Sequence, residues 1–187
     1  MTHDESIHKT LFDYAEDMAL GTGYEAQPCH LARALEVIGE RWTMLILRDL
    51  FYGVRHFSDL LEHLDVSRGV LTERLDTLVA AGVVTRRKVG RTVEYELTPA
   101  GEELWPTLFS LIRWGRRHLD ADFPARVFAH ATCGTDLEES GLCPRCGIVP
   151  TVRDIDTRPG EGPNPRRRND PVAVALRTRH RMLTPVP

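Results

Sequence analysis

The chain has 187 residues, of which 42% are hydrophobic and 27% are charged, a balance typical of one globular domain with room for an extension. No apolar run approaches the roughly 18 residues of a membrane span, which excludes an integral membrane protein. The polar start of the chain lacks the pattern of a signal peptide, so we expect a cytoplasmic protein. Four cysteines in such a chain point to metal or redox chemistry rather than a disulfide framework.

The net charge of −3 is unevenly distributed along the chain. Residues 153–187 carry eight arginines against four acidic residues, so the remainder of the chain is acidic. This distribution excludes a uniformly basic DNA-coating protein but is compatible with a local basic surface.

Apolar residues at helical spacing predict three helices in the first third of the chain. An amphipathic helix is expected over residues 5–20 and ends at the glycines of residues 21–23. Two further helices are expected over residues 31–39 and 41–51.

The next segment has the pattern of a helix-turn-helix. Ser58 is a plausible N-cap for a short helix over residues 58–64, and Ser67 caps a second helix over residues 68–81 that ends before Gly82. Two short helices joined by so tight a turn match this motif.

The hydrophobic period then changes from helix to strand. Residues 83–88 and 92–97 are rich in β-formers and predict a hairpin. Thr98 and Pro99 then begin a helix that runs to about residue 120. This helix carries more apolar surface than one small domain needs to cover its own core.

A helix-turn-helix followed by a hairpin suits contact with double-stranded DNA, because the second helix fits the major groove and the hairpin can follow the backbone. Cations on the hairpin suit phosphate contact. A solvated hairpin whose charges serve solubility is the alternative, and Arg55 and Arg74 are equally suited to surface ion pairs. The candidate DNA-binding residues are Arg55, Ser67, Arg68, Thr72, Arg74, Arg86, Arg87, Lys88 and Arg91.

The order of motifs from about Cys29 to Leu119 resembles the HxlR-type winged helix-turn-helix transcriptional regulators. The matching stretches are Gly39-Glu40-Arg41-Trp42-Thr43, Arg55-His56-Phe57-Ser58-Asp59-Leu60, Leu71-Thr72-Glu73-Arg74-Leu75, Val93-Glu94-Tyr95 and Trp114-Gly115. The resemblance implies a homodimeric regulator, not an enzyme, that binds an inverted-repeat operator. It also implies dimerisation through the terminal helices.

Cys29 stands alone before a predicted helix. The resemblance implies that a cysteine here can act as a thiol sensor, and a helix N-terminus favours the reactive thiolate. A small buried structural residue is the alternative. If Cys29 is a sensor, the effector would be an oxidant or a small molecule.

A second group of residues has the spacing of a metal site, H-x2-C-x9-C-x2-C. The four ligands would be His130, Cys133, Cys143 and Cys146. One imidazole and three thiolates are soft donors that suit a closed, structural tetrahedral zinc site. A thioredoxin-like redox pair at Cys143 and Cys146 is the alternative, although the strand–helix context for it is missing.

These observations together predict an α+β fold that is mostly α. We expect an N-terminal dimerisation helix at residues 1–24, a winged helix-turn-helix at 25–120, a zinc-ribbon-like segment at 121–152 and a disordered Pro/Arg-rich tail at 153–187. The predicted function is DNA-binding transcriptional regulation. The alternative is a zinc-ribbon interaction module, or a thiol- or zinc-dependent redox protein, without sequence-specific DNA binding.

Overall fold

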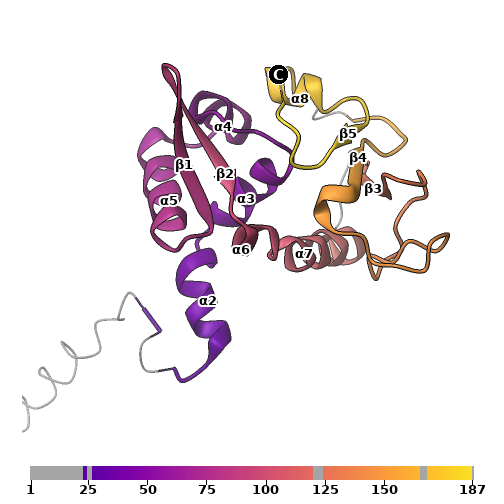
Figure 1. Cartoon of the computed structure of the whole chain (residues 1–187), viewed down its shortest axis with the longest axis horizontal. Coiled ribbons are helices and arrows are strands. Elements are labelled where there is room, and N and C mark those ends of the chain that lie inside the picture. The colour runs from indigo at the N-terminus through magenta and orange to yellow at the C-terminus, as the bar shows by residue number, and fades with distance from the viewer. Residues whose placement is uncertain (1–22, 25–26, 120–123, 165–167, 187) are drawn as a thin grey trace, which may run out of the picture. The chain divides into compact units, whose positions relative to one another are not determined.

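The computed structural model describes residues 23–24, 27–119, 124–164 and 168–186. The chain forms two compact units, Met1–Gly39 and Glu40–Pro187, which are described separately (Figure 1). In the first unit, α2 spans His30–Ile38 with Cys29 in extended conformation before it. The helix expected over residues 5–20 lies outside the described residues.

The second unit begins with three helices, each of which contributes buried residues to the core. They are α3 (Thr43–Phe51), α4 (Phe57–Leu64) and α5 (Arg68–Ala80). Leucines three or four residues apart put one buried face on α4 and one on α5. The buried leucines are Leu60, Leu64, Leu71, Leu75 and Leu78.

The turn between α4 and α5 is fixed by two local features. Asp65 ends α4 in the left-handed conformation, with φ of 53°. The Ser67 hydroxyl accepts a hydrogen bond of 3.3 Å from the Val70 amide and caps α5. The predicted helix-turn-helix is therefore present.

The hairpin follows as β1 (Val84–Val89) and β2 (Thr92–Leu97), which pair antiparallel with Val84 opposite Leu97 and Val89 opposite Thr92. We call this hairpin the wing. Its second strand also contacts the segment before α4, because the Tyr95 amide donates to the Arg55 carbonyl at 2.9 Å. Buried Tyr95 anchors the wing to the core.

The single helix expected from residue 98 to about 120 is two helices. α6 spans Pro99–Glu102 and α7 spans Trp105–His118. Pro106 lies at the start of α7 and has no amide hydrogen for the helical ladder, so a continuous helix is interrupted before it.

The expectation of a disordered tail at residues 153–187 is wrong for the residues that the structure describes. β3 (Val127–His130), β4 (Ile155–Arg158) and β5 (His180–Arg181) form one antiparallel sheet in that order. A short 3-10 helix, η1 (Val152–Asp154), precedes β4, and α8 spans Pro171–Ala175. The pairing of β3 with β4 also crosses the boundary expected at residue 152.

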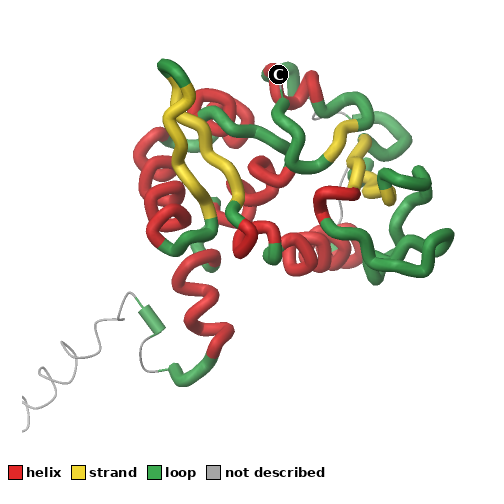
Figure 2. The backbone as a smooth tube through the Cα atoms, viewed as in Figure 1, coloured by secondary structure: helices red, strands yellow, loops and turns green. Residues whose placement is uncertain are grey.

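Order in the C-terminal part (residues 124–164 and 168–186) comes from the burial of apolar residues that are a minority in its composition. Val172, Leu176 and Met182 are between 1% and 4% exposed. The Arg179 and Arg181 guanidinium groups both bind the Asp156 carboxylate, at 2.7 and 2.6 Å. Figure 2 shows that loops make up most of this part, whereas helices dominate the part before it.

The C-terminal part packs directly on the winged helix-turn-helix. The Leu183 amide donates to the Phe51 carbonyl at 2.8 Å, and the Val186 amide donates to the Gly53 carbonyl at 3.0 Å. The rings of Trp105 and Phe128 meet edge to face, with centroids 5.2 Å apart. This packing covers part of the apolar surface on residues 98–119, which the resemblance attributes to dimerisation through the terminal helices.

Another part of that surface remains open. Leu111 and Trp114 on α7 are each 51% exposed, whereas Trp105, Leu108 and Phe109 are buried. Among the described residues, none of the helices combines the length and the hydropathy needed to cross a membrane.

Candidate nucleic-acid interface and cysteine–histidine cluster

The N-terminal turns of α5 present an open polar surface. Arg68 and Thr72 are exposed, as is Ser67. The Arg68 guanidinium lies over the Phe57 ring at 5.2 Å from its centroid, which restricts the side chain without occupying its hydrogen-bond donors. Gly69 is also exposed, and a Cβ at this position would meet no atom within 4 Å. The backbone of this turn can therefore approach a partner closely.

The cations of the wing fall into two groups. Arg86, Lys88 and Arg91 are exposed and form no ion pair with any described residue, which also holds for Arg68. Arg87, in contrast, lies 3.4 Å from the Glu94 carboxylate and 3.2 Å from that of Glu96. The register explains this difference, because Arg87 is directly opposite Glu94 in the hairpin.

Two other candidate residues also have acidic partners. The Arg55 guanidinium binds the Glu96 carboxylate at 2.6 Å. Arg74 pairs with Glu73, and it lies 3.7 Å from Glu40. Arg55 and Arg74 are thus partly buried and ion-paired, and ion pairing is the alternative that the sequence left open for both.

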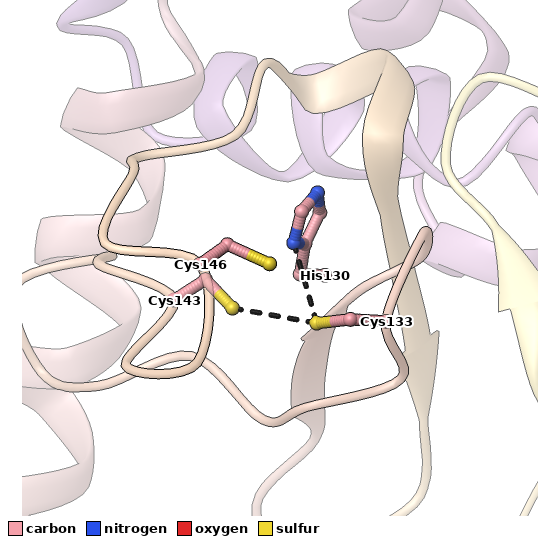
Figure 3. Close-up of side chains that lie close together, drawn as sticks. All are labelled: His130, Cys133, Cys143 and Cys146. Atoms are coloured by element: carbon pink, nitrogen blue, oxygen red, sulfur yellow. Dashed lines mark hydrogen bonds between the residues drawn. The ribbon is translucent and has the colours of Figure 1, made fainter.

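The cysteine–histidine cluster consists of His130, Cys133, Cys143 and Cys146, and the structure brings all four together. Their ligand atoms lie within 4.8 Å of one another (Figure 3). The Cys133 sulfur is 3.4 Å from His130 Nδ1 and 3.5 Å from the Cys143 sulfur. These separations are far longer than a disulfide bond of about 2 Å. They are close to the edges of about 3.6 and 3.8 Å that the usual Zn–N and Zn–S bond lengths give a tetrahedron.

Two similar turns hold the cluster. Gly134 follows Cys133 with φ of 74°, and Gly147 follows Cys146 with φ of 67°. In each turn the glycine amide donates back to the carbonyl of the first ligand, at 2.7 Å to His130 and 2.9 Å to Cys143. This repetition, visible in the sequence as H-x2-C-G and C-x2-C-G, was not predicted.

A carboxylate outside the cluster orients its histidine. His130 Nε2 lies 2.8 Å from the Asp154 carboxylate, which also accepts a 2.8 Å hydrogen bond from the Thr132 hydroxyl. The Thr132 bond is the main reason that the pKa of Asp154 lies below its ordinary value. The ionised carboxylate holds the ring with Nδ1 turned toward the sulfurs, an arrangement common around metal-binding histidines. No motif in the sequence indicated this role for Asp154.

The thiols of the cluster have different acidities. Hydrogen bonds from Thr135 lower the pKa of Cys133 to about 6, which favours its thiolate at neutral pH. Hydrogen bonding with Cys133 raises the pKa of Cys146 to about 11. A group of one imidazole and three sulfurs, with one thiolate already favoured, can bind a metal ion.

Known proteins are similar to this chain in its winged helix-turn-helix. A model of the HxlR-like helix-turn-helix family matches residues 37–123. The chain is 38% identical over 136 residues to the HTH-type transcriptional regulator Rv3095 of Mycobacterium tuberculosis, covering 71% of this chain and 86% of that one.

The chain belongs to the HxlR-like helix-turn-helix family.

The chain is also similar to a second HTH-type regulator and to a redox regulator of known structure. The HTH-type transcriptional regulator YvaP of Bacillus subtilis is 35% identical over 95 residues, covering 49% of this chain and 88% of that one. Among solved structures, the redox regulator HypR in its oxidized form is 28% identical, with a TM-score of 0.46, and covers 50% of this chain and 100% of that one. The family consists of transcriptional regulators rather than enzymes, and this chain is a DNA-binding transcriptional regulator.

Two features of this HxlR-like regulator lie outside the range matched by the family model. The cysteine–histidine cluster follows residue 123, so the motif that identifies the family does not include it. Cys29 precedes residue 37; it is a free, exposed thiol at the N-cap position of α2. The exposure of Cys29 disagrees with its alternative interpretation as a small buried residue.

Proposed function

We propose that this HxlR-like regulator binds its operator as a homodimer, with α5 in the major groove and the wing on the flanking phosphates. The observation that carries the proposal is the open N-terminal surface of α5 beside three wing cations without acidic partners among the described residues. Each protomer would then bind one half of an inverted repeat, with the half-sites about 34 Å apart or a multiple of that distance.

Arg68 is the residue that we assign to base recognition. It lies in the first turn of α5, and its planar guanidinium can donate two hydrogen bonds to the O6 and N7 atoms of a guanine. Its contact with Phe57 reduces the freedom that the side chain would lose on binding. Ser67 and Thr72 are smaller neighbours suited to phosphate or base contacts.

Arg86, Lys88 and Arg91 are the residues that we assign to phosphate contact on the wing. Their charges are not offset by a described acidic residue, so each can neutralise a phosphate without first breaking an ion pair. Arg55, Arg74 and Arg87 would contribute less to affinity, because glutamates already share their charges.

The exposed apolar part of α7 supports the proposed dimer. Leu111 and Trp114 form a surface that the C-terminal part leaves uncovered. Residues 1–24 would complete the interface. We expect Trp114→Glu to shift the sedimentation of the protein toward a monomer, and Arg116→Ala on the same helix to leave it unchanged. A stable monomer in the unmodified protein at micromolar concentration would contradict the dimer.

We also propose that the cysteine–histidine cluster binds structural Zn²⁺. The support is the donor set, the separations of 3.4 and 3.5 Å, and the carboxylate that orients His130. When bound, zinc would cross-link the two glycine turns and stabilise the short strands around them. The protein groups would orient the ligands and close the site, so no position remains for a reacting molecule.

We propose that an oxidant effector reacts with the thiol of Cys29. Its exposure at the N-cap of α2 supports thiol chemistry, since helix N-termini favour thiolates. With zinc bound to the other three cysteines, Cys29 should be the one thiol that reacts rapidly with a maleimide. Mass spectrometry that found another cysteine labelled first would contradict this assignment.

The experiment that tests DNA recognition compares Arg68→Ala with Arg116→Ala, a matched exposed arginine on α7. Binding is measured to the duplex that the intact protein selects from a random pool and to a scrambled duplex. Arg68→Ala should cost about 1–3 kcal/mol on the selected duplex and little on the scrambled one, as expected for a lost base contact. An equal loss on both duplexes would make Arg68 a phosphate contact and contradict its assignment.

A further inference from the structure

A cavity of about 370 Å³ lies between the helices that follow the wing and the C-terminal part. One wall comes from α6 and α7, and the other comes from residues 137–155. The volume falls within the range of small-molecule sites. The side chains that give the cavity its apolar character are Trp105, Phe109, Leu137, Val149, Val152 and Ile155.

Acidic groups supply the charge at this cavity. Glu102 and Glu103 both line it. Arg153 lies on Glu102, with Nε 2.9 Å from the carboxylate, and offsets one of the two charges. Glu103 is exposed and forms no ion pair with a described residue, so one negative charge remains unbalanced. This charge disfavours an anionic ligand and favours a cationic one.

The aromatic walls favour the same kind of ligand. Trp105 and Phe109 line the cavity, and aromatic rings of this kind attract organic ammonium ions. The Arg113 guanidinium already lies over Phe109, at 5.8 Å from the ring centroid, so Trp105 is the main aromatic group for a ligand. Hydroxyl groups of Ser110, Ser140 and Thr151 also line it and can accept hydrogen bonds from an ammonium group. Apolar walls, two aromatic rings and an unpaired carboxylate are the chemistry that recognises an amine attached to a ring.

We propose that this cavity binds a small organic ammonium ion that carries an apolar ring. The proposal goes beyond DNA recognition and does not rest on it. The site adjoins the wing, because Thr98, which caps α6, donates from its hydroxyl to the Gly82 carbonyl at 2.7 Å. A bound ligand would therefore contact the helix that is tied to the start of the wing.

The test uses three probes that share one ring and differ in charge: 1-naphthylmethylamine, 1-naphthylmethanol and 1-naphthoic acid. Each is titrated into the full-length protein by calorimetry. The amine should bind about fivefold more tightly than the alcohol, as expected for one partly exposed ammonium contact. The acid should bind most weakly. No binding of the amine, or binding of the acid as tight as that of the amine, would overturn the proposal.

Two tryptophan variants locate the site. Ser110 is exposed on α7 and lines the cavity, so Ser110→Trp should fill it and reduce amine affinity at least about tenfold. Thr107 is exposed on the same helix and does not line this cavity, so Thr107→Trp is the matched control and should leave affinity unchanged. Equal losses in both variants, with circular dichroism unchanged, would place the binding elsewhere and overturn the proposal.

A third variant tests the charge. Glu103→Gln should reduce the preference for the amine over the alcohol, while the affinity for the alcohol stays the same. An undiminished amine preference in this variant would overturn the role of Glu103. If the affinity for the amine falls as the protein concentration rises, a second copy of the chain occupies the cavity. That result would overturn the ligand proposal.

Discussion

The winged helix-turn-helix and the C-terminal part obtain their order in different ways. In α4 and α5, leucines at helical spacing specify each helix locally, and a serine cap begins α5. In the C-terminal part, the strands have only two to four residues, and they depend on contacts distant in sequence. One such contact joins the Leu183 amide to the Phe51 carbonyl. A region with weak local signals can therefore still belong to the same folded unit.

Removing one ligand of the cluster should change the structure more than any other substitution considered. Cys143 is fully buried and lies 3.5 Å from the Cys133 sulfur. Cys143→Ser should remove the proposed metal and raise amide hydrogen exchange throughout residues 127–155, because the short strands there lose their cross-link. The exchange of α4 and α5 should change little.

Elemental analysis of protein purified without chelator provides the control for that variant. The unmodified protein should contain about one zinc per chain, which is the content of a single four-ligand site. A content far below this value would contradict the metal proposal. Equal loosening of α5 and residues 127–155 in Cys143→Ser would contradict the distinction between the two regions.

The contact between the two regions can be broken at a single glycine. Gly53 has φ of 87°, and a Cβ there would lie 1.7 Å from the Thr184 carbonyl oxygen. Gly82 has φ of 69° but has open space around it. Gly82→Ala should therefore cost about 1–2 kcal/mol of unfolding free energy from backbone strain alone. Gly53→Ala should cost about 1–3 kcal/mol more, because the chain at Thr184 must move.

Urea unfolding measures both glycine variants. Equal losses would show that residues 184–186 contribute nothing to the stability of the winged helix-turn-helix, which would contradict the packing described here.

The sequence alone predicted the first region much better than the second. Ser67, Gly82 and the hairpin residues have strong local preferences, so the helix-turn-helix and the wing could be placed within a residue or two. The break before Pro106 was missed because the apolar spacing continues across it. The acidic partners of Arg55 and Arg87 depend on strand register, which side-chain type does not reveal. The order of Val172 and Met182 was missed because prolines and arginines dominate the composition around them.

A smaller effect is expected at Asp170, which joins α8 to α4. Its carboxylate accepts a 2.9 Å bond from the Ala173 amide and lies 2.8 Å from His63 Nδ1 and 3.0 Å from Arg168 Nε. Burial opposes its ionisation, but the Ala173 and His63 bonds outweigh burial and lower its pKa. Asp170→Asn should cost about 1–2 kcal/mol of unfolding free energy at pH 7.

The pH dependence of that cost follows from the lowered pKa. The stabilisation is fully present above the pKa of an unfolded aspartate, about 3.9, and is lost as pH falls through the lower pKa of the folded state. The stabilities of wild type and Asp170→Asn should therefore converge in acid. Asp136→Asn is the control, since Asp136 is half exposed and pairs with Arg158 on the surface. Its cost should be at most about 1 kcal/mol.

Two neighbouring wing arginines should differ slightly in how much they contribute to the salt dependence of DNA binding. Arg86→Ala should reduce the slope of log K against log salt by about one unit per half-site, as expected for one lost phosphate contact. Arg87→Ala should change the slope less, because Glu94 and Glu96 already share its charge. Filter binding across a salt series measures both. A larger change for Arg87→Ala would show that its ion pairs break on binding and would reverse this ranking.

Protection of guanine N7 from methylation is the sharpest test of base recognition by α5, because that atom faces the major groove. With the full-length protein on its selected duplex, we predict one protected guanine in each of two half-sites about 34 Å apart, or at a multiple of that spacing. Arg68→Ala should abolish the protection at saturating protein. Sequence-specific binding without a protected guanine, or protection that Arg68→Ala leaves unchanged, would contradict the claim that α5 recognises bases through Arg68.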